Sequence, residues 1–447
     1  MPNETNTNTS FKIMGARTNN TSSWLYARKK LVALDRQTLI PIEVHWRYEN
    51  ETESKTGKYF SDTDPNQRII ATLGSENITL NIANISSDCT SIVAIKNDGK
   101  ATSYVNPANG GTMPDFIENH NIRLASGGSD SLLAINKENE LFTWGSDENG
   151  VLDTPDGLST MEIEQIRGGS GAICVMGKKG DIKVWGKETQ LPPNEIATLS
   201  DVKNIYSGFD FAVLRKNGKI ASWGEVTNAP PEDISALDDI VDVAAGGYGF
   251  AAIREYTVRK VVGWGSKYYN MDVPDNIASL DDIAEVHASL DFFVARRTNG
   301  SVVAWGENDH GCAQVPSQIA ALTDIIDVQL AGETAVAILR ENGTVMTWGG
   351  PISSAVPAGL NNVIALSGIR GAFAALKSNG TVVGWGIYTT EGMEDQLTDV
   401  CGVYSNGNSF WALKNDDTVV VWGDKGWGGD MADVPTDLQG NISYEAK

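Results

Sequence analysis

The chain has 447 residues, of which 41% are hydrophobic, so it can bury a large core and is not disordered by composition. Its formal net charge of −22 opposes binding to nucleic-acid phosphates and to anionic membranes, and it favours a basic protein partner. The four cysteines fit neither a zinc spacing nor a disulfide framework and are predicted to be free thiols: Cys89, Cys174, Cys312 and Cys401.

Residues 1–75 are predicted to form a small β-rich segment. Hydrophobic residues alternate through Ile42, Val44, Trp46 and Tyr48, which is the pattern of a half-buried strand. A second strand is expected over 68–73. We expect this segment to act as a cap or strand donor for the domain that follows.

Residues 76–440 contain a repeat of about forty residues. Trp-Gly recurs eight times in this register, and Tyr104 holds the same place in one further, degenerate unit. From Tyr104 to Trp422 is 318 residues in eight steps. So regular a period indicates a repeat architecture in which each unit packs against its neighbours.

Each unit has the same predicted order of elements. A strand follows a Leu-x-Asp/Asn-Val/Ile signal, a glycine loop leads to a second strand, and a hairpin leads to a third strand that ends at Trp-Gly. Four hairpins contain Asn-Gly outright, at 217, 299, 342 and 379, and both residues of that pair tolerate the positive φ of tight hairpins. A linker that usually contains proline then restarts the unit.

The fold class predicted from this pattern is all-β. It is a closed β-propeller of eight or nine three- to four-stranded blades, with the small N-terminal β-rich segment added. The second strands are apolar on both faces, as expected for blades packed between two neighbours. The count depends on whether the degenerate first unit belongs to the ring. The first and last units should touch, because closure removes exposed sheet edges. Residues 441–447 are expected to form a C-terminal tail.

The stretch VVAWGENDHGCAQVP at 302–316 resembles the repeat of the regulator of chromosome condensation family. The short period is similar to that of bacterial relatives, including the propeller-type β-lactamase inhibitor proteins. The resemblance covers roughly residues 76–440 and implies a propeller fold. A guanine-nucleotide-exchange role, known in the eukaryotic part of the family, is carried over by no matched residue.

The repeated tryptophans are predicted to be structural. They recur at one position of the unit, where an aromatic ring would pack between blades. They are Trp144, Trp185, Trp223, Trp264, Trp305, Trp348, Trp385 and Trp422.

The sequence predicts neither a catalytic site, a cofactor nor a metal. Only four histidines occur, at unrelated repeat positions, so they offer no convergent catalytic group. Glycine runs that faintly resemble phosphate loops, such as GGSGA at 168–172, fall at the repeated turn and lack the lysine of a Walker motif. We therefore expect a protein that is not an enzyme.

One face of the ring is predicted to bind a protein partner. The glycine loops and the residues after Trp-Gly must share a face, because the strands of a unit alternate in direction. Acidic residues on that face (Asp147, Glu148, Asp210, Asp309 and Asp424) would steer a basic partner. Aromatic and histidine side chains expected to contact it are Phe209, Tyr248, Tyr268, Tyr269, His310, Tyr388 and Trp427.

Two further expectations complete the sequence-based view. A secreted carbohydrate-binding or toxin-associated propeller module is the alternative function. No signal-peptide pattern opens the chain and no apolar run reaches the length of a membrane span, so we expect a cytoplasmic protein, or one exported without a recognisable signal peptide.

Overall fold

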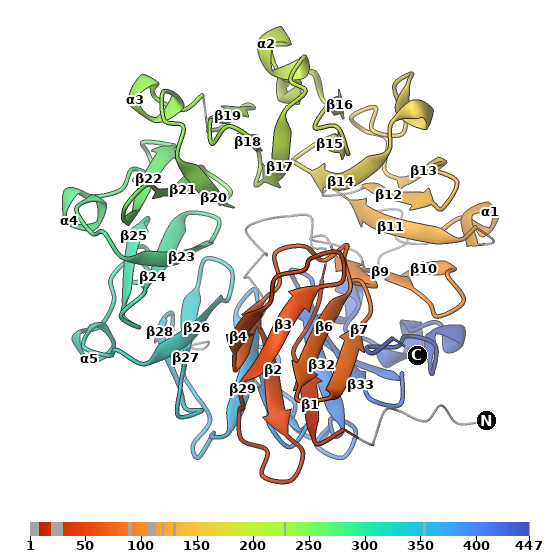
Figure 1. Cartoon of the computed structure of the whole chain (residues 1–447), viewed down its shortest axis with the longest axis vertical. Helices are drawn as coiled ribbons and strands as arrows, with labels where there is room; N and C mark the ends of the chain where they lie inside the picture. Colours follow the sequence, from red (N-terminus) through yellow and green to blue (C-terminus); the bar gives the residue numbers. More distant parts are fainter. Residues whose placement is uncertain are drawn as a thin grey trace.

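The computed structural model describes residues 9–18, 30–87, 92–104, 113–118, 120–127, 131–227, 229–351 and 355–446. Nine three-stranded antiparallel sheets follow one another around a ring (Figure 1). The all-β propeller prediction is confirmed, and the degenerate unit of Tyr104 forms a blade of its own, which makes nine. In the described residues each blade has three strands.

The nine blades are numbered in chain order, and in each the three strands are adjacent in sequence. Blades 1 to 3 are formed by β8 (Ile85–Ser87), β9 (Ile92–Ile95), β10 (Ala101–Tyr104); β11 (Ile122–Gly127), β12 (Ser131–Asn136), β13 (Leu141–Gly145); β14 (Ile163–Gly168), β15 (Ala172–Gly177) and β16 (Ile182–Gly186). Blades 4 to 6 are formed by β17 (Val202–Ser207), β18 (Phe211–Arg215), β19 (Ile220–Trp223); β20 (Ile240–Ala245), β21 (Gly249–Glu255), β22 (Arg259–Gly265); β23 (Ile283–Ala288), β24 (Phe292–Arg297) and β25 (Val302–Gly306). Blades 7 to 9 are formed by β26 (Ile325–Leu330), β27 (Ala335–Arg340), β28 (Val345–Gly349); β29 (Val363–Ile369), β30 (Ala372–Lys377), β31 (Val382–Gly386); β32 (Val400–Ser405), β33 (Ser409–Lys414) and β34 (Val419–Gly423).

Short helices lie at the outer rim of the ring (Figure 1). In five linkers a proline immediately precedes the helix, where its fixed φ suits a helix start, and the helix buries one isoleucine, for example Ile277 after Pro274. The helices are α1 (Asp115–Glu118), α2 (Asn194–Ala197), α3 (Glu232–Ser235), α4 (Asp275–Ala278), α5 (Ser317–Ala320), and the 3-10 turns η3 (Leu158–Thr160), η4 (Glu188–Gln190), η5 (Lys425–Trp427), η6 (Met431–Asp433) and η7 (Thr436–Leu438).

The two faces of the ring differ in the turns that they carry. We call the face with the glycine loops and the loops after Trp-Gly the loop face, and the face with the hairpins between second and third strands the hairpin face. The glycine loops lie where blades approach most closely: a Cβ at Gly208 would lie 1.8 Å from the carbonyl oxygen of Gly246, and one at Gly368 would lie 2.0 Å from that of Leu330. Only glycine fits at such contacts.

The Leu-x-Asp signal has a structural cause on the hairpin face. In four successive blades its aspartate pairs with an arginine at the end of the second strand. The nitrogen–oxygen distances are 2.7 to 2.9 Å, and the pairs are Asp201–Arg215, Asp239–Arg254, Asp282–Arg297 and Asp324–Arg340. Each pair fixes the start of the first strand against the hairpin of its own blade.

The ring closes between blades 9 and 1. Ser87 Oγ on β8 donates a hydrogen bond to the carbonyl of Ser405 on β32, at 2.9 Å. The backbone N–H of Asn97 donates to the carbonyl of Asn441, at 2.8 Å. Figure 1 places β9 and β10 beside the C terminus. The predicted contact between the first and last units is confirmed.

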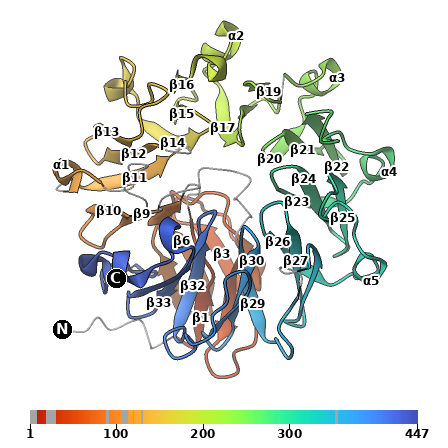
Figure 2. The same ribbon diagram turned by 180° about the vertical axis from the view of Figure 1, so that it is seen from behind.

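The N-terminal region forms two sheets on the hairpin face, over blades 8 and 9 (Figures 1 and 2). Gly15 N–H donates to the carbonyl of Cys401, at 2.8 Å, and Lys12 Nζ donates to the carbonyl of Ser378, at 3.1 Å. The sheets are β1 (Phe11–Met14), β2 (Lys30–Asp35), β5 (Tyr59–Ser61), and β4 (Lys55–Gly57), β3 (Val44–Tyr48), β6 (Ile69–Leu73), β7 (Glu76–Leu80).

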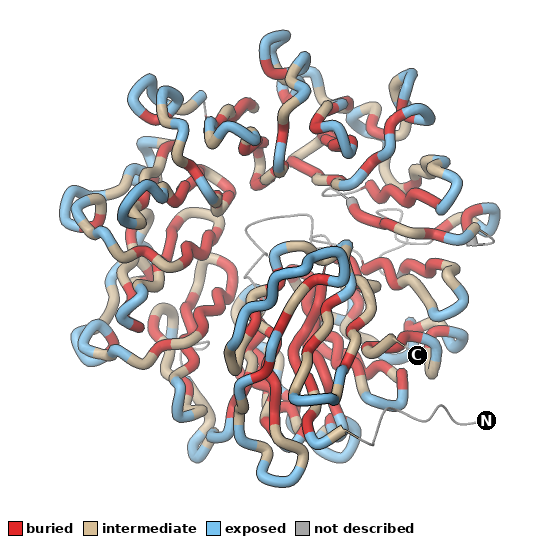
Figure 3. Tube along the Cα trace, viewed as in Figure 1, coloured by how far each residue is buried: buried red, intermediate tan, exposed pale blue. Residues whose placement is uncertain are grey.

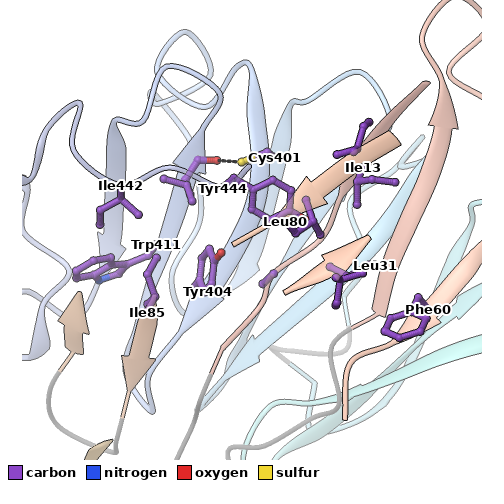
Figure 4. Close-up of a cluster of buried hydrophobic side chains, with 14 of the residues drawn as sticks. Ile13, Leu31, Phe60, Leu80, Ile85, Cys401, Tyr404, Trp411, Ile442 and Tyr444 are labelled. Atoms are coloured by element: carbon purple, nitrogen blue, oxygen red, sulfur yellow. Dashed lines mark hydrogen bonds between the residues drawn. The ribbon is translucent and has the colours of Figure 1, made fainter. Parts of the chain in front are cut away.

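The N-terminal sheets extend past the expected boundary at residue 75. Strand β7 runs from Glu76 to Leu80 and pairs with β6, because Ile78 and Leu80 are both fully buried in the N-terminal core. The C-terminal residues are part of the same core rather than a separate tail. Tyr444 OH donates to the carbonyl of Gly15, at 2.7 Å, and its ring belongs to the same buried cluster as Tyr404 and Leu80 (Figure 4).

Burial follows the repeat. The strands are largely buried, and exposed residues are concentrated in the hairpins, linkers and rim helices (Figure 3). Cys174, Cys312 and Cys401 are buried free thiols, as predicted, whereas Cys89 lies outside the described residues. Among described residues, no helix has the length and apolar character needed to cross a membrane. Within those ranges no cluster of three His, Cys, Asp or Glu side chains is arranged to hold a metal ion.

Candidate functional site

Four of the predicted contact residues form one continuous aromatic row on the loop face. The ring centroids of Phe209 and Tyr248 are 5.3 Å apart, Tyr248 stacks on Tyr269 at 3.9 Å, and Tyr269 meets the edge of Tyr268 at 4.9 Å. The row ends at Tyr268, which is 80% exposed. It therefore offers a preformed apolar surface that runs from blade 4 to the outer loop of blade 5.

Backbone contacts between blades hold the row in place. Tyr248 N–H donates to the carbonyl of Leu290 in the glycine loop of blade 6, at 2.9 Å, and Ser266 N–H donates to the carbonyl of Tyr248, at 2.8 Å. A hydrogen bond with Tyr248 raises the pKa of Tyr269, so the Tyr269 hydroxyl stays neutral at physiological pH. The aromatic row is thus rigid and uncharged.

A cluster of carboxylates lies beside the row, and the sequence analysis missed it. Asp291 is in the glycine loop of blade 6, Glu307 follows Trp305-Gly306, and Glu333 is in the glycine loop of blade 7. Burial, followed by the charge of Glu333, raises the pKa of Asp291 to about 6. Asp291 and Glu307 are also close enough to raise the pKa of Tyr269. We call Asp291, Glu307 and Glu333 the acidic cluster.

The other three predicted residues are on the same face but make separate contacts. His310 is exposed in the loop after Trp305, and its charge lowers the pKa of Asp291. Tyr388 OH donates to Asp424 Oδ2, at 3.0 Å. Trp427 is half-buried and packs against the core shared by blades 9 and 1. The seven predicted contact residues therefore form two groups rather than one. The first is the aromatic row, with His310 near the acidic cluster beside it, and the second is Tyr388 and Trp427 on blades 8 and 9.

One acidic residue expected at the rim of the loop face is not there. Asp210 is completely buried and accepts hydrogen bonds from the backbone N–H groups of Glu225, Val226 and Thr227, at 2.6 to 2.9 Å. It also accepts one from Gln190 Nε2. Asp210 is a structural anchor for the loop after Trp223, because its carboxylate satisfies amides that would otherwise be unpaired.

The eight repeated tryptophans are all buried, with exposed fractions of 1 to 6%. Five of them pair with a phenylalanine of the second strand at centroid distances of 5.0 to 5.4 Å. Such pairs add to the stability gained from burial alone.

The hairpin face carries a concavity of different charge. A cavity of about 990 Å³ lies between loops of the N-terminal region and the first strands of blades 2 to 5. Basic side chains outnumber acidic ones in its lining, and they include Arg123, Arg167, Lys203 and Arg259.

No protein-family model matches the sequence, and no curated protein matches it. Solved structures that are similar to the chain include propellers of low sequence identity. The CRINKLY WD40 ectodomain of the Arabidopsis thaliana receptor kinase ACR4 is 15% identical, over 71% of this chain and 94% of that chain, with a TM-score of 0.40. The ectodomain of the Physcomitrella patens receptor kinase CR4 is 17% identical, over 67% and 71% of the two chains, with a TM-score of 0.39.

Prp20p of Saccharomyces cerevisiae is 15% identical, over 69% of this chain and 82% of that chain, with a TM-score of 0.37. Prp20 is yeast RCC1, so the similar structures include the family that the repeat resembles. The bacterial short-repeat form stays a prediction.

Proposed function

We propose that the chain is a non-catalytic protein-binding propeller whose partner docks on the loop face and is basic where it meets the acidic cluster. The observation that carries this proposal is the aromatic row of Phe209, Tyr248, Tyr269 and Tyr268 directly beside Asp291 and Glu307. The described sheets of the N-terminal region lie on the opposite face.

Each part of this surface has a physical role in binding. Rigid tyrosines bury a large apolar area at a small cost in conformational entropy, which is why they often dominate interface energetics. Carboxylates beside them attract a lysine or arginine, whose cation can also lie over a tyrosine ring. A peptide that presents a basic side chain next to an apolar one would satisfy both.

The surroundings of His287 and His310 do not favour a catalytic role. His287 is buried in blade 6, with its Nε2 3.5 Å from Glu285 Oε1, and is inaccessible to a substrate. His310 is exposed, and its neighbouring carboxylates belong to the acidic cluster. General acid–base chemistry needs a group positioned against a bound substrate.

Replacing Tyr268 and Tyr269 together by alanine is expected to weaken partner binding by about 2 kcal/mol or more, because it removes the exposed half of the aromatic row. The partner would be captured from a lysate on the immobilised chain, identified by mass spectrometry, and titrated calorimetrically against each variant. The ring should stay folded, because Tyr268 is exposed and Tyr269 is half-buried.

Tyr256 provides the matched control, because it is 86% exposed on the same blade but in the hairpin between β21 and β22. Tyr256→Ala should leave affinity unchanged. Equal losses from Tyr256→Ala and the double variant, or a loss only from Tyr256→Ala, would place the docking surface elsewhere and refute the proposal.

Binding of a basic partner is expected to weaken as the pH falls through about 6. Asp291, whose pKa burial raises to about 6, is charged at pH 7 and becomes neutral at pH 5. The expected loss is about 0.5–1 kcal/mol, typical of one partly exposed charge pair. Asp291→Asn should bind at pH 7 as the native chain binds at pH 5, with a flatter pH profile. Because the pKa of Asp291 is raised in the folded state, its ionisation also lowers the free energy of unfolding as the pH rises through about 6. An unchanged pH profile in Asp291→Asn would exclude Asp291 from the interface.

A further inference from the structure

The cavity on the hairpin face differs in charge from the rest of the chain. Its lining contains six basic and four acidic side chains, whereas the whole chain has a formal net charge of −22. A surplus of positive charge inside a concavity attracts anions, because the walls concentrate the field there. The six basic residues are Lys55, Arg123, Arg167, Lys178, Lys203 and Arg259.

Two of the six cations already have a carboxylate partner within the chain. Lys178 Nζ is 3.1 Å from Glu162 Oε1, and Arg259 Nη1 is 2.9 Å from Glu255 Oε2. An incoming anion would have to compete with these carboxylates for the two side chains. They are therefore not the groups that would contribute most to binding an anion.

Other cations of the lining can still donate hydrogen bonds to a ligand. Lys55 on β4 and Lys203 on β17 are exposed, and neither forms an ion pair with another described residue. Arg123 on β11 donates from Nη2 to Asn139 Oδ1, at 2.8 Å, which uses one of the five N–H groups of its guanidinium. These three side chains come from the N-terminal region, blade 4 and blade 2, so they approach the cavity from separate elements.

Hydrogen bonds fix the wall that the first strands, innermost in their blades, contribute to the cavity (Figure 1). Gln165 Nε2 donates to Asn204 Oδ1, at 3.1 Å, and Gln165 Oε1 accepts from the backbone N–H of Ile205, at 3.0 Å. On the other side, Asn66 Nδ2 of the N-terminal region donates to the carbonyl of Glu164 in blade 3, at 3.0 Å. The wall is therefore preformed, which lowers the entropic cost of binding.

We propose that this cavity binds a small organic polyanion, a molecule that carries two or more phosphate or carboxylate groups. Several anionic groups suit the site better than one, because its cations lie on separate elements. The volume of about 990 Å³ is within the range of about 300–1,000 Å³ that small-molecule sites have. Leu124, Met176 and Val241 also line the cavity and would contact the carbon skeleton of the ligand.

This inference does not rest on the proposed function, and its test does not require the protein partner. The full chain would be titrated calorimetrically with sodium tripolyphosphate and with citrate in about 0.15 M salt, where charges are screened over roughly 8 Å. We expect one anion to bind per chain, and the tighter of the two assigns the charged groups of the ligand as phosphate or carboxylate. No saturable binding of either anion would overturn the proposal. Tighter binding of a hexaglutamate peptide than of both anions would overturn it in favour of an acidic protein segment.

A charge-reversal variant tests whether the anion binds in the cavity. Lys55→Glu with Lys203→Glu should weaken binding of the tighter anion by about tenfold or more, because it replaces two donors by two carboxylates. Both lysines are exposed, so the ring should stay folded, which circular dichroism would check.

The matched control is Lys179→Glu with Lys219→Glu. These lysines lie in hairpins of blades 3 and 4 on the same face, outside the lining of the cavity, and the variant changes the net charge by the same amount. It should change the affinity by less than about twofold, because exposed charges outside the site are screened. An equal loss in the two double variants would mean that the anion is attracted by general surface charge, and the cavity would be refuted as its site.

Discussion

Trp422→Ala should lower the free energy of unfolding by about 3–5 kcal/mol, the range found when a large buried aromatic side chain is truncated. The ring of Trp422 is 3% exposed and stacks on Phe410 at 5.0 Å, within the core between blades 8 and 9. Its Nε1 makes no hydrogen bond in the described residues, so the loss would measure packing alone. Trp422 belongs to blade 9, whereas the aromatic row lies on blades 4 and 5.

Urea unfolding followed by circular dichroism would measure this loss. Trp422→Phe is the control, since it keeps an aromatic ring against Phe410 and should lose only part of the stability. A native unfolding curve for Trp422→Ala would mean that the repeated Trp position is not structural, and the sequence-based interpretation of all eight would then be wrong.

Glu285→Gln should destabilise the chain by about 3–5 kcal/mol, the cost of leaving buried charges without their partner. Glu285 Oε1 accepts from Lys30 Nζ at 2.9 Å and from Arg296 Nε at 2.5 Å, and its side chain is only 6% exposed. Lys30 comes from β2 of the N-terminal region, whereas Glu285 and Arg296 belong to blade 6. The carboxylate therefore ties the N-terminal region to the ring.

The control is a second ion pair between the same two parts of the chain. Lys58 and Glu341 are 3.5 Å apart, with side chains that are 41% and 60% exposed. Glu341→Gln should cost under about 1 kcal/mol, because water screens an exposed pair. If both glutamine variants unfolded at the same urea concentration, Glu285 would not be a structural anchor.

The stability supplied by Glu285 should depend on pH in a definite direction. Burial alone would raise its pKa, but the charges of Lys30, His287 and Arg296 outweigh burial and hold the pKa well below its usual value. The stabilisation is therefore present above the unfolded pKa, near 4.5, and is lost as the pH falls through the lower folded value. Glu285→Gln should flatten the acid side of the stability profile.

The repeat made the fold predictable and left parts of the site hidden. Spacing along the sequence defines the unit, its hairpins and its Trp column, because each depends on residues within about forty positions. The sequence did not predict that the rings of Phe209, Tyr248 and Tyr269 contact one another, because that contact depends on the rotation between adjacent blades. The acidic cluster also assembles from three loops of blades 6 and 7, and no local pattern marks it.

Two departures show where local patterns are insufficient. Aspartate is usually exposed, but the backbone amides of the loop after Trp223 surround the carboxylate of Asp210 and bury it. The sequence alone does not show that this loop folds back over Asp210. The N-terminal sheets end at Leu80 rather than near residue 75, because β7 pairs with β6 at the edge of its sheet. Both outcomes are decided by tertiary contacts that override local composition.

The joint core of the N-terminal sheets and blade 9 has a consequence for synthesis on the ribosome. Tyr444 and Gly15, which are hydrogen-bonded, are 429 residues apart in the chain. At about 5–20 residues per second, the N-terminal strands emerge roughly 20–90 seconds before the residues that complete their core. During that interval Phe11, Leu31 and Ile78 have no native cover from blade 9, so the nascent chain exposes apolar strand surface of the kind that chaperones bind.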